Sequence, residues 1–355
     1  MKLAQRARRA GIAAAMAAVV GGSGFAAGAA ATSQPPASRP PGATASPHAP
    51  APAGYAALVR QVLPSVVLIR TPDGLGSGVI LDTDGNIVTN AHVAGDATRF
   101  QVQLAGDPSP RSAHLVGSYR SGDIAVIRAD DTSGLRPARF GDSARAQAGE
   151  VVLAIGNPLG LSGSVTEGIV SATGRAVTES ATPGSPSVTL PDAIQTSAPI
   201  NPGNSGGALV NASGEVIGIP TLAAASPQGG AQAQGIGFAI PANTARDLAV
   251  QIIRSGHVTN SHRAALGAEV TTVARADGAA TGVGIVAVSA GGPADRAGLR
   301  AGDVIAKLGG TPTPDTTTLA EALAAADPRQ AVTATITRGT QTFTVKIILG
   351  ELQGG

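Results

Sequence analysis

Short apolar runs separated by glycine-rich or polar turns make up most of the chain beyond its first fifty residues. The runs at residues 79–81 and 86–89 flank the tetrapeptide DTDG, which predicts a strand, a turn and a strand. Residues 55–63 end at Pro64 and predict a short helix. Many short strands joined by such turns are typical of a mainly β protein.

The pattern changes in the last third of the chain. Residues 241–254 have helical spacing, and the polar residues 255–263 that follow predict a linker between two domains. Beyond the linker, residues 318–326 predict a helix and residues 331–349 predict a hairpin. The sequence therefore predicts a second, smaller domain over residues 264–351.

The first residues are those of a targeting segment. Lys2 and three arginines precede an uncharged, alanine-rich run at residues 10–31, so residues 1–31 resemble a secretory signal peptide with small-residue cleavage sites. The run is also long enough for a membrane anchor that is not cleaved. Either alternative puts the folded part outside the cytoplasm, in a periplasm, a cell envelope or the medium. Residues 32–54 are rich in Pro, Ala and Ser and predict a disordered linker.

Composition excludes several classes of function. The 25 basic and 23 acidic residues nearly balance, so nothing indicates a nucleic-acid partner. The chain has no cysteine, which excludes disulfides, thiolate metal sites and cysteine nucleophiles. We find no pattern for a metal, a nucleotide or another cofactor.

The candidate chemistry centres on residues 201–207, NPGNSGG. Glycines around Ser205 can hold it on a tight turn and leave backbone N–H groups free to point at one spot, as an acyl-transfer nucleophile requires. A plain glycine-rich turn between strands has the same composition. His92 follows a predicted strand, and Asp123 precedes another. The order His92, Asp123, Ser205 is one of the orders in which a Ser-His-Asp triad occurs.

Five segments together make the chain similar to a known family. They are TNAHV at 89–93, SGDIAVI at 121–127, GEVVLAIGNPLGL at 149–161, IQTSAPINPGNSGGALV at 194–210 and GIGFAIP at 235–241. These segments resemble the HtrA (Deg) family of trypsin-like serine proteases. The resemblance implies a chymotrypsin-like fold of two six-stranded antiparallel β-barrels over residues 55–254.

The resemblance also assigns roles to individual residues. Ser205 would be the nucleophile, His92 the general base and Asp123 the residue that orients the histidine. The oxyanion would be bound by backbone N–H groups of Gly203 and Ser205, with Asn204 as a further candidate. The resemblance places the substrate pocket at Pro199, Ile200, Ile219, Gly235, Ile236, Gly237 and Phe238. These residues include no carboxylate, so we expect cleavage after small or medium aliphatic residues.

Two positions depart from the family pattern. Ser197 stands where the family commonly has Asp, and Ala208 stands where Pro commonly follows Ser-Gly-Gly. Residues 175–188 and 223–234 fall where the family has mobile regulatory loops, although ordinary solvated loops have the same composition.

Residues 264–351 resemble the PDZ domain of the same family. Such a domain binds an extended peptide along a sheet edge and holds its terminal carboxylate with backbone N–H groups. By similarity those groups belong to Ala265, Leu266, Gly267 and Ala268. A small domain that only steadies the protease is the alternative.

Together these features predict an exported serine endopeptidase that acts on unfolded or damaged envelope proteins. The alternative is a chaperone-like or peptide-binding protein whose protease fold is silent. The family resemblance also implies a homotrimer, formed through the segment around Tyr55.

Overall fold

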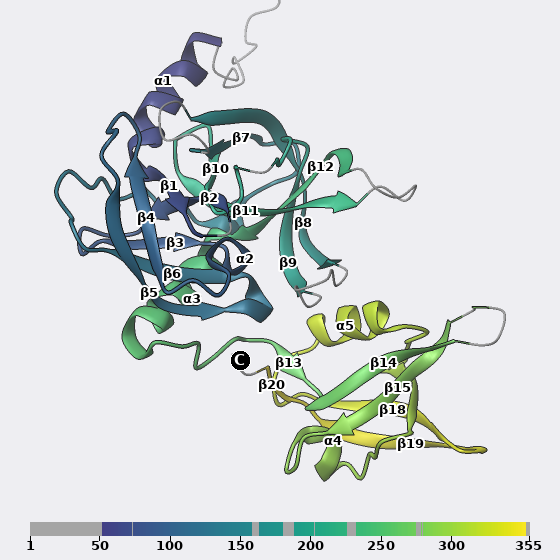
Figure 1. Cartoon of the computed structure of the whole chain (residues 1–355). Helices are drawn as coiled ribbons and strands as arrows, with labels where there is room; N and C mark the ends of the chain where they lie inside the picture. Colours follow the sequence, from purple (N-terminus) through teal and green to yellow (C-terminus); the bar gives the residue numbers. More distant parts are fainter. Residues whose placement is uncertain are drawn as a thin grey trace, which may run out of the picture. The chain divides into compact units, whose positions relative to one another are not determined.

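The computed structural model describes residues 52–72, 74–157, 163–179, 188–201, 203–225, 232–274, 278 and 280–352. The expected signal peptide or anchor and all but the end of the expected tether lie outside these ranges. Within them the chain is mainly β, as predicted from the sequence (Figure 1).

The first barrel follows a short amino-terminal helix. Helix α1 spans Pro52–Val62 and continues into the 3-10 turn η1, Leu63–Ser65. The strands are β1 Val66–Arg70, β2 Leu75–Ile80, β3 Asn86–Thr89, β4 Arg99–Leu104, β5 Arg111–Tyr119 and β6 Ile124–Ala129. They close in the order β1-β2-β3-β6-β5-β4, with every pair antiparallel. Two further short turns, α2 Ala91–Ala94 and η2 Arg120–Gly122, lie between strands.

These strands are apolar on both faces because each face meets a different cluster. Side chains point alternately to opposite sides of a strand. Val67 and Ile127 lie in a cluster confined to the first barrel, whereas Val66 and Val126 lie in a cluster shared with the second barrel. The shared cluster holds the two barrels together.

The second barrel has the same design. Its strands are β7 Val151–Gly156, β8 Ser164–Glu179, β9 Val188–Thr196, β10 Ala208–Asn211, β11 Val216–Ala225 and β12 Gln232–Pro241, after the turn η3 Ser143–Arg145. They close in the order β10-β11-β12-β9-β8-β7. The expected loops at 175–188 and 223–234 are shorter than the composition suggested, because β8 pairs with β9 as far as Glu179 and β11 pairs with β12 as far as Ala225. Residues 180–187 and 226–231 lie outside the described ranges.

Helix α3, Ala242–Ser255, closes the protease region one residue later than the sequence predicts. Leu248 and Ile252 lie on its buried face and join the shared cluster. Gly256 ends the helix in the left-handed region (φ 78°) and donates its N–H to the Ile252 carbonyl.

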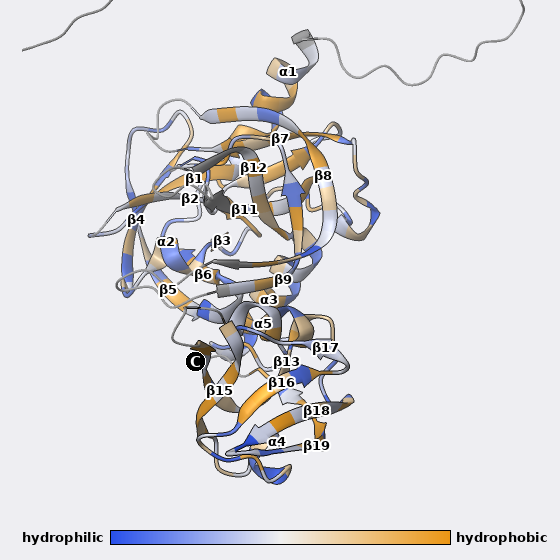
Figure 2. Ribbon diagram, turned by 90° about the vertical axis from the view of Figure 1, so that its right-hand side faces the viewer, coloured by the Kyte–Doolittle hydropathy of each residue, from blue (hydrophilic) through white to orange (hydrophobic). Residues whose placement is uncertain are grey.

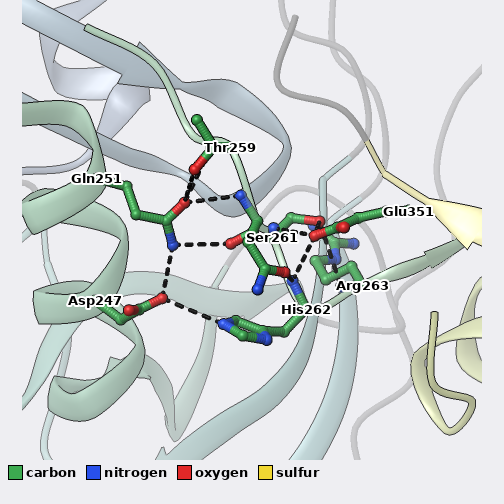
Figure 3. Close-up of polar contacts among 8 residues, drawn as sticks. Asp247, Gln251, Thr259, Ser261, His262, Arg263 and Glu351 are labelled. Carbon is green, nitrogen blue, oxygen red and sulfur yellow. Dashed lines mark hydrogen bonds and ion pairs between the residues drawn. The ribbon is translucent and has the colours of Figure 1, made fainter. Parts of the chain in front are cut away.

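Side chains of α3 hold the linker that follows it (Figure 3). The Gln251 Oε1 atom accepts hydrogen bonds from the N–H groups of Thr259 and Asn260 (2.9 and 2.8 Å), and its Nε2 donates to the Asn260 carbonyl (2.8 Å). The N–H of Ser261 then donates to Glu351 Oε1 at 2.5 Å. The linker is thus hydrogen-bonded along its length.

The carboxy-terminal domain is a sheet with two short helices. Its elements are β13 Ala264–Ala265, β14 Ala268–Ala274, β15 Ala280–Val288, α4 Pro293–Arg296, β16 Val304–Leu308, β17 Thr311–Pro312, α5 Thr316–Ala324, β18 Ala331–Arg338, β19 Gln341–Ile348 and β20 Gly350–Glu351. The main sheet has the order β14-β15-β16-β18-β19, and β13 pairs with β20. Helix α5 begins two residues before the predicted start because the Asp315 side chain caps it.

The strands of the carboxy-terminal domain carry both apolar and polar residues (Figure 2). In β18, for example, Val332, Ala334 and Ile336 are buried and the residues between them are more exposed. These side chains belong to a cluster that shares no residue with the clusters of the two barrels. The second domain therefore has a core of its own.

Candidate active site

His92 and Asp123 lie side by side in the first barrel. The His92 Nδ1 atom lies 3.0 and 2.9 Å from the two carboxylate oxygens of Asp123, and the backbone N–H of His92 donates to Oδ1 at 3.0 Å. A carboxylate only accepts hydrogen bonds, so Nδ1 carries a proton and the neutral ring keeps its lone pair on Nε2. The Asp123 side chain is 6% exposed and that of His92 is 42% exposed, so the imidazole bridges a buried charge and the surface.

Short helical turns position the His92 and Asp123 side chains. His92 is the second residue of α2, the one-turn helix that directly follows β3 and Asn90. Asp123 follows η2 in the left-handed region (φ 52°), where few residues other than glycine are found. The Asn90 side-chain amide donates to the Asp123 carbonyl (3.1 Å) and ties the two segments together.

Thr221 links His92 and Asp123 to the second barrel, and no motif in the sequence marks Thr221 as part of the site. Its hydroxyl donates to Asp123 Oδ2, and its carbonyl accepts from the Ser205 hydroxyl at 3.4 Å. Thr221 lies in β11, and Asp123 is 98 residues away in sequence. Asp123 and Ser205 are therefore neighbours through Thr221, and His92 contacts the same carboxylate.

The turn that carries Ser205 depends on its glycines. Gly206 has φ 78°, and a Cβ atom there would lie 2.3 Å from the carbonyl oxygen of Ser77. Only glycine fits such a close approach of two backbones. Gly203 has φ 111°, and the N–H of Asn204 donates to the Asn201 carbonyl at 3.0 Å. The plain-turn and catalytic interpretations share this geometry, and Thr221 connects the turn to Asp123.

Two of the expected pocket residues are in contact. Ile200 is buried, and a Cβ atom at Gly237 would lie 2.5 Å from its Cγ1 atom. Pro199 is exposed, and its carbonyl accepts from the side-chain amide of Asn204 at 3.3 Å. The segment before the serine turn is therefore connected to the turn itself.

The other expected pocket residues are more dispersed. Ile219 and Phe238 are buried in the cluster shared by the barrels, whereas Ile200 belongs to a cluster of the second barrel alone. Ile236 is 37% exposed, and Gly235 is exposed beside it.

The two departures from the family pattern have ordinary structural roles. The Ser197 hydroxyl accepts from the Ile169 N–H at 3.0 Å, and the Ser197 N–H donates to the Ile169 carbonyl at 3.1 Å. Ala208 is buried and pairs with Ile155 at the start of β10. Ala208 lies within a regular strand pair, and Ser197 follows the end of β9, where its backbone and hydroxyl both bind Ile169.

The carboxy-terminal domain presents a groove beside an edge strand. Residues 265–268 and the α5 residues Leu319 and Leu323 line the groove, together with Thr189 and Pro191 of β9. Gly267 has φ 65°, and β14, which begins at Ala268, stands at the edge of the main sheet. This arrangement suits the addition of an extended peptide.

Nowhere among the described residues do three His, Asp or Glu side chains gather as they would around a metal ion. None of the described helices has the length and apolar character needed to cross a membrane.

Comparison with known proteins identifies the family. Residues 76–219 match the trypsin-like peptidase domain and residues 264–349 match the PDZ domain. Serine protease PepD of Mycobacterium tuberculosis is 38% identical over 343 residues, which cover 90% of this chain and 71% of PepD. The crystal structure of the serine endoprotease from Yersinia pestis is similar with a TM-score of 0.57 and 35% identity, over 84% of this chain and 98% of that one. The HtrA-type protease AlgW with decapeptide is similar with a TM-score of 0.58 and 32% identity, over 85% and 99%. The chain belongs to the HtrA family of serine proteases.

Other HtrA relatives are longer than this chain. The periplasmic serine endoprotease DegP of Escherichia coli K12 is 43% identical over 242 residues, which cover 67% of this chain and 49% of DegP. The chain thus spans about half the length of that relative. HtrA membership accounts for the paired barrels, for the His92–Asp123 contact and for the separate PDZ domain.

Proposed function

We propose that this HtrA-family chain is an exported endopeptidase that hydrolyses unfolded or damaged envelope proteins, with Ser205, His92 and Asp123 as its catalytic triad. The observation that carries the proposal is the buried Asp123 carboxylate, which contacts His92 and, through Thr221, is connected to Ser205. Serine, histidine and aspartate are the residue types that a nucleophile, a general base and an orienting acid require.

The chemistry follows from these positions. His92 takes the Ser205 proton as the oxygen attacks the peptide carbonyl, and it returns that proton to the leaving amine. Asp123 holds the ring in the tautomer with its proton on Nδ1 and stabilises the imidazolium that forms. Water then attacks the acyl-enzyme with His92 again as base, which releases the acid product and restores Ser205.

The oxyanion is bound by the N–H groups of Gly203 and Ser205. The Asn204 N–H is already used by the Asn201 carbonyl, which narrows the three candidates to two. Loss of one such donor typically costs about a hundredfold or more in rate.

The substrate residue before the cut is a small or medium aliphatic residue in this proposal. Pro199, Ile200 and Gly237 supply apolar walls near the serine turn, and none of the proposed pocket residues carries a charge. Preferred cleavage after Lys or Arg in a peptide library would contradict this part of the proposal.

The PDZ domain recruits substrates or regulates the protease domain by binding peptide segments along β14. The groove between Leu266 and the α5 residues Leu319 and Leu323 receives side chains of the added strand, and backbone N–H groups of residues 265–268 hold its end.

Export is supported by the relatives named periplasmic and by the pattern of residues 1–31, which serves as a signal peptide or as an anchor in the cytoplasmic membrane. We further propose a homotrimer formed around α1. Tyr55 of that helix is half-buried and packs against the shared cluster of its own chain, and it is the aromatic residue of this helix. Light scattering on residues 50–355 measures the oligomeric state.

The decisive experiment compares the wild-type chain with Ser205→Ala on unfolded casein. We expect cleavage by the wild type and a loss of at least roughly 10⁴-fold in the variant, because the nucleophile is absent. Ser213→Ala is the matched control, because Ser213 is exposed in the turn between β10 and β11 and only its backbone N–H makes a described hydrogen bond. This variant should cleave casein as the wild type does. Equal, negligible cleavage by wild type and Ser205→Ala, across temperature and with added peptides, would support the silent chaperone-like alternative.

A further inference from the structure

A fully buried serine of the first barrel reaches the serine turn of the second. Ser77 in β2 donates its hydroxyl to the Gly203 carbonyl at 2.6 Å, and the same Oγ atom accepts from the Asn157 N–H at 2.8 Å. These partners are 126 and 80 residues away in sequence and belong to two different segments of the second barrel. One hydroxyl therefore bridges three parts of the chain.

The backbone of Ser77 is engaged at the same place. Its N–H donates to the Ser205 carbonyl at 3.0 Å, and its carbonyl accepts from the Thr89 hydroxyl at 2.7 Å. Its carbonyl also faces Gly206, where a Cβ atom would lie 2.3 Å away. Ser77 thus contacts the turn on both sides of the nucleophile.

The Ser77 hydroxyl binds the peptide group that lies between the two proposed oxyanion donors. That peptide joins Gly203 to Asn204, and it is held at both ends: its carbonyl accepts from Ser77 and its N–H donates to Asn201. Turning it would rotate ψ of Gly203 and φ of Asn204, and so change the angle between the N–H groups of Gly203 and Ser205. Stabilisation of an oxyanion requires both donors to converge on one oxygen.

Glycine at position 203 makes this restraint necessary. Without a side chain Gly203 has access to a wide range of backbone angles, and its φ of 111° is one that other residues rarely adopt. The turn therefore needs an external partner to stay in one arrangement, and the buried hydroxyl of Ser77 is such a partner.

We propose that Ser77 is a positioning residue for the oxyanion turn, and that its bridge from Gly203 to Asn157 keeps the two N–H donors convergent. The inference rests on the proposed function, because it takes Gly203 and Ser205 as the oxyanion donors. It differs from a role in packing alone, which would change stability without a selective effect on the transition state.

The test is Ser77→Ala, assayed on a peptide with an aliphatic residue before the cut. We expect kcat to fall about 10- to 100-fold, as for partial loss of an oxyanion donor, while KM stays within about twofold. A peptide boronate of the same sequence forms a tetrahedral adduct with Ser205, so its inhibition constant should rise by a similar factor. Binding of the uncleaved peptide, measured in the Ser205→Ala background, should not change.

Ser143→Ala is the matched control. Ser143 is also buried and its hydroxyl accepts from a backbone N–H, that of Asn243 at 3.1 Å, but it contacts no part of the serine turn. Its kcat and its boronate affinity should equal those of the wild type. If Ser77→Ala does not fold, Ser77→Cys fills the same space with a much weaker donor and is measured in the same way.

Three results would overturn the inference. They are an unchanged kcat in folded Ser77→Ala, a kcat loss without a matching loss of boronate affinity, and failure of both Ser77 variants to fold, which would assign Ser77 to folding. An inactive wild type would instead contradict the proposed function, so the two failures are distinguishable.

Discussion

At the scale of single residues, the site depends on hydroxyl groups that connect the two barrels. Thr221 serves Asp123 with its side chain and Ser205 with its carbonyl. A buried carboxylate that loses a hydrogen-bond donor is poorly solvated, and it then orients the adjacent imidazole less well. Thr221 should therefore affect catalysis without touching the substrate.

We predict that Thr221→Val lowers kcat about 10- to 100-fold, which corresponds to the roughly 1.5–3 kcal/mol of a hydrogen bond to a charged group. Valine keeps the shape of threonine and leaves the carbonyl that Ser205 uses. Steady-state kinetics on a peptide substrate measures the effect. Thr221→Ser retains the hydroxyl and should restore most of the activity; equal kcat values for the valine variant and the wild type would contradict the prediction.

At the scale of elements, α3 and the linker form one hydrogen-bonded unit. Gln251 binds the backbone of Thr259 and Asn260, and its Nε2 atom also donates to Asp247 at 2.8 Å (Figure 3). His262 Nε2 lies 3.4 Å from the same carboxylate. The polar composition of residues 255–263 predicts a linker, but the linker is held by specific bonds.

We predict that Gln251→Ala increases amide exchange at Thr259 and Asn260 by roughly 10- to 100-fold. The change removes three hydrogen bonds that Gln251 accepts from the linker and one that it donates to the linker, each worth about 0.5–1.5 kcal/mol. An added protease should also cut within residues 255–262 faster. Both measurements use the Ser205→Ala background, which prevents self-digestion. Arg254→Ala, a change at an exposed position of the same helix, is the control. Exchange rates that match the control would show that Gln251 does not restrain the linker.

At the scale of the whole molecule, the two domains have separate apolar cores. The PDZ domain has one buried carboxylate among its described residues, Asp303, whose side chain is 1% exposed. Arg338 donates to both of its oxygens at 2.6 and 2.8 Å, and the Arg300 N–H donates at 2.9 Å. The hydrogen bonds from Arg338, with the backbone N–H of Arg300, hold the pKa of Asp303 below its usual value.

The sign of the resulting pH dependence follows from that lowered pKa. Above about pH 4, the usual pKa of aspartate, the carboxylate is ionised in both folded and unfolded chains and its contribution to stability is complete. As the pH falls below that value, the unfolded chain is protonated first. The contribution of Asp303 to stability therefore decreases, and it is gone once the pH lies below the pKa of Asp303 in the folded chain. We predict that Asp303→Asn lowers the free energy of unfolding of the PDZ domain by about 1–3 kcal/mol at pH 7, and that the difference shrinks under acid conditions.

Calorimetry measures this difference between the Ser205→Ala chain and the same chain with Asp303→Asn added. Both tyrosines of the sequence, Tyr55 and Tyr119, lie outside the PDZ domain, so a transition without a change in tyrosine fluorescence belongs to that domain. A difference between the two chains that stays constant from neutral to acid pH would contradict the role of the ion pair.

Much of the fold and of the candidate site could be predicted, because the strands and the serine turn depend on residues that are close together in the sequence. Short apolar runs between turns indicated the strands, and Gly203 and Gly206 marked the turn around Ser205. Helix ends were displaced by one to three residues, because caps such as Asp315 and Gly256 depend on geometry at the boundary. The loops after β8 and β11 were expected to begin earlier, because composition does not show that a partner strand will satisfy the backbone.

The sequence by itself determined the class of the protein, and it indicated the order of its domains and the three residue types of the proposed triad, because these depend on short segments whose chemistry is local. Only the tertiary structure decided which hydroxyls support that triad. Thr221 and Ser77 are ordinary strand residues in the sequence, and their partners Asp123 and Gly203 are 98 and 126 residues away. Closure of the two barrels around a shared apolar cluster brings such distant groups within hydrogen-bond distance, and no local pattern encodes that approach.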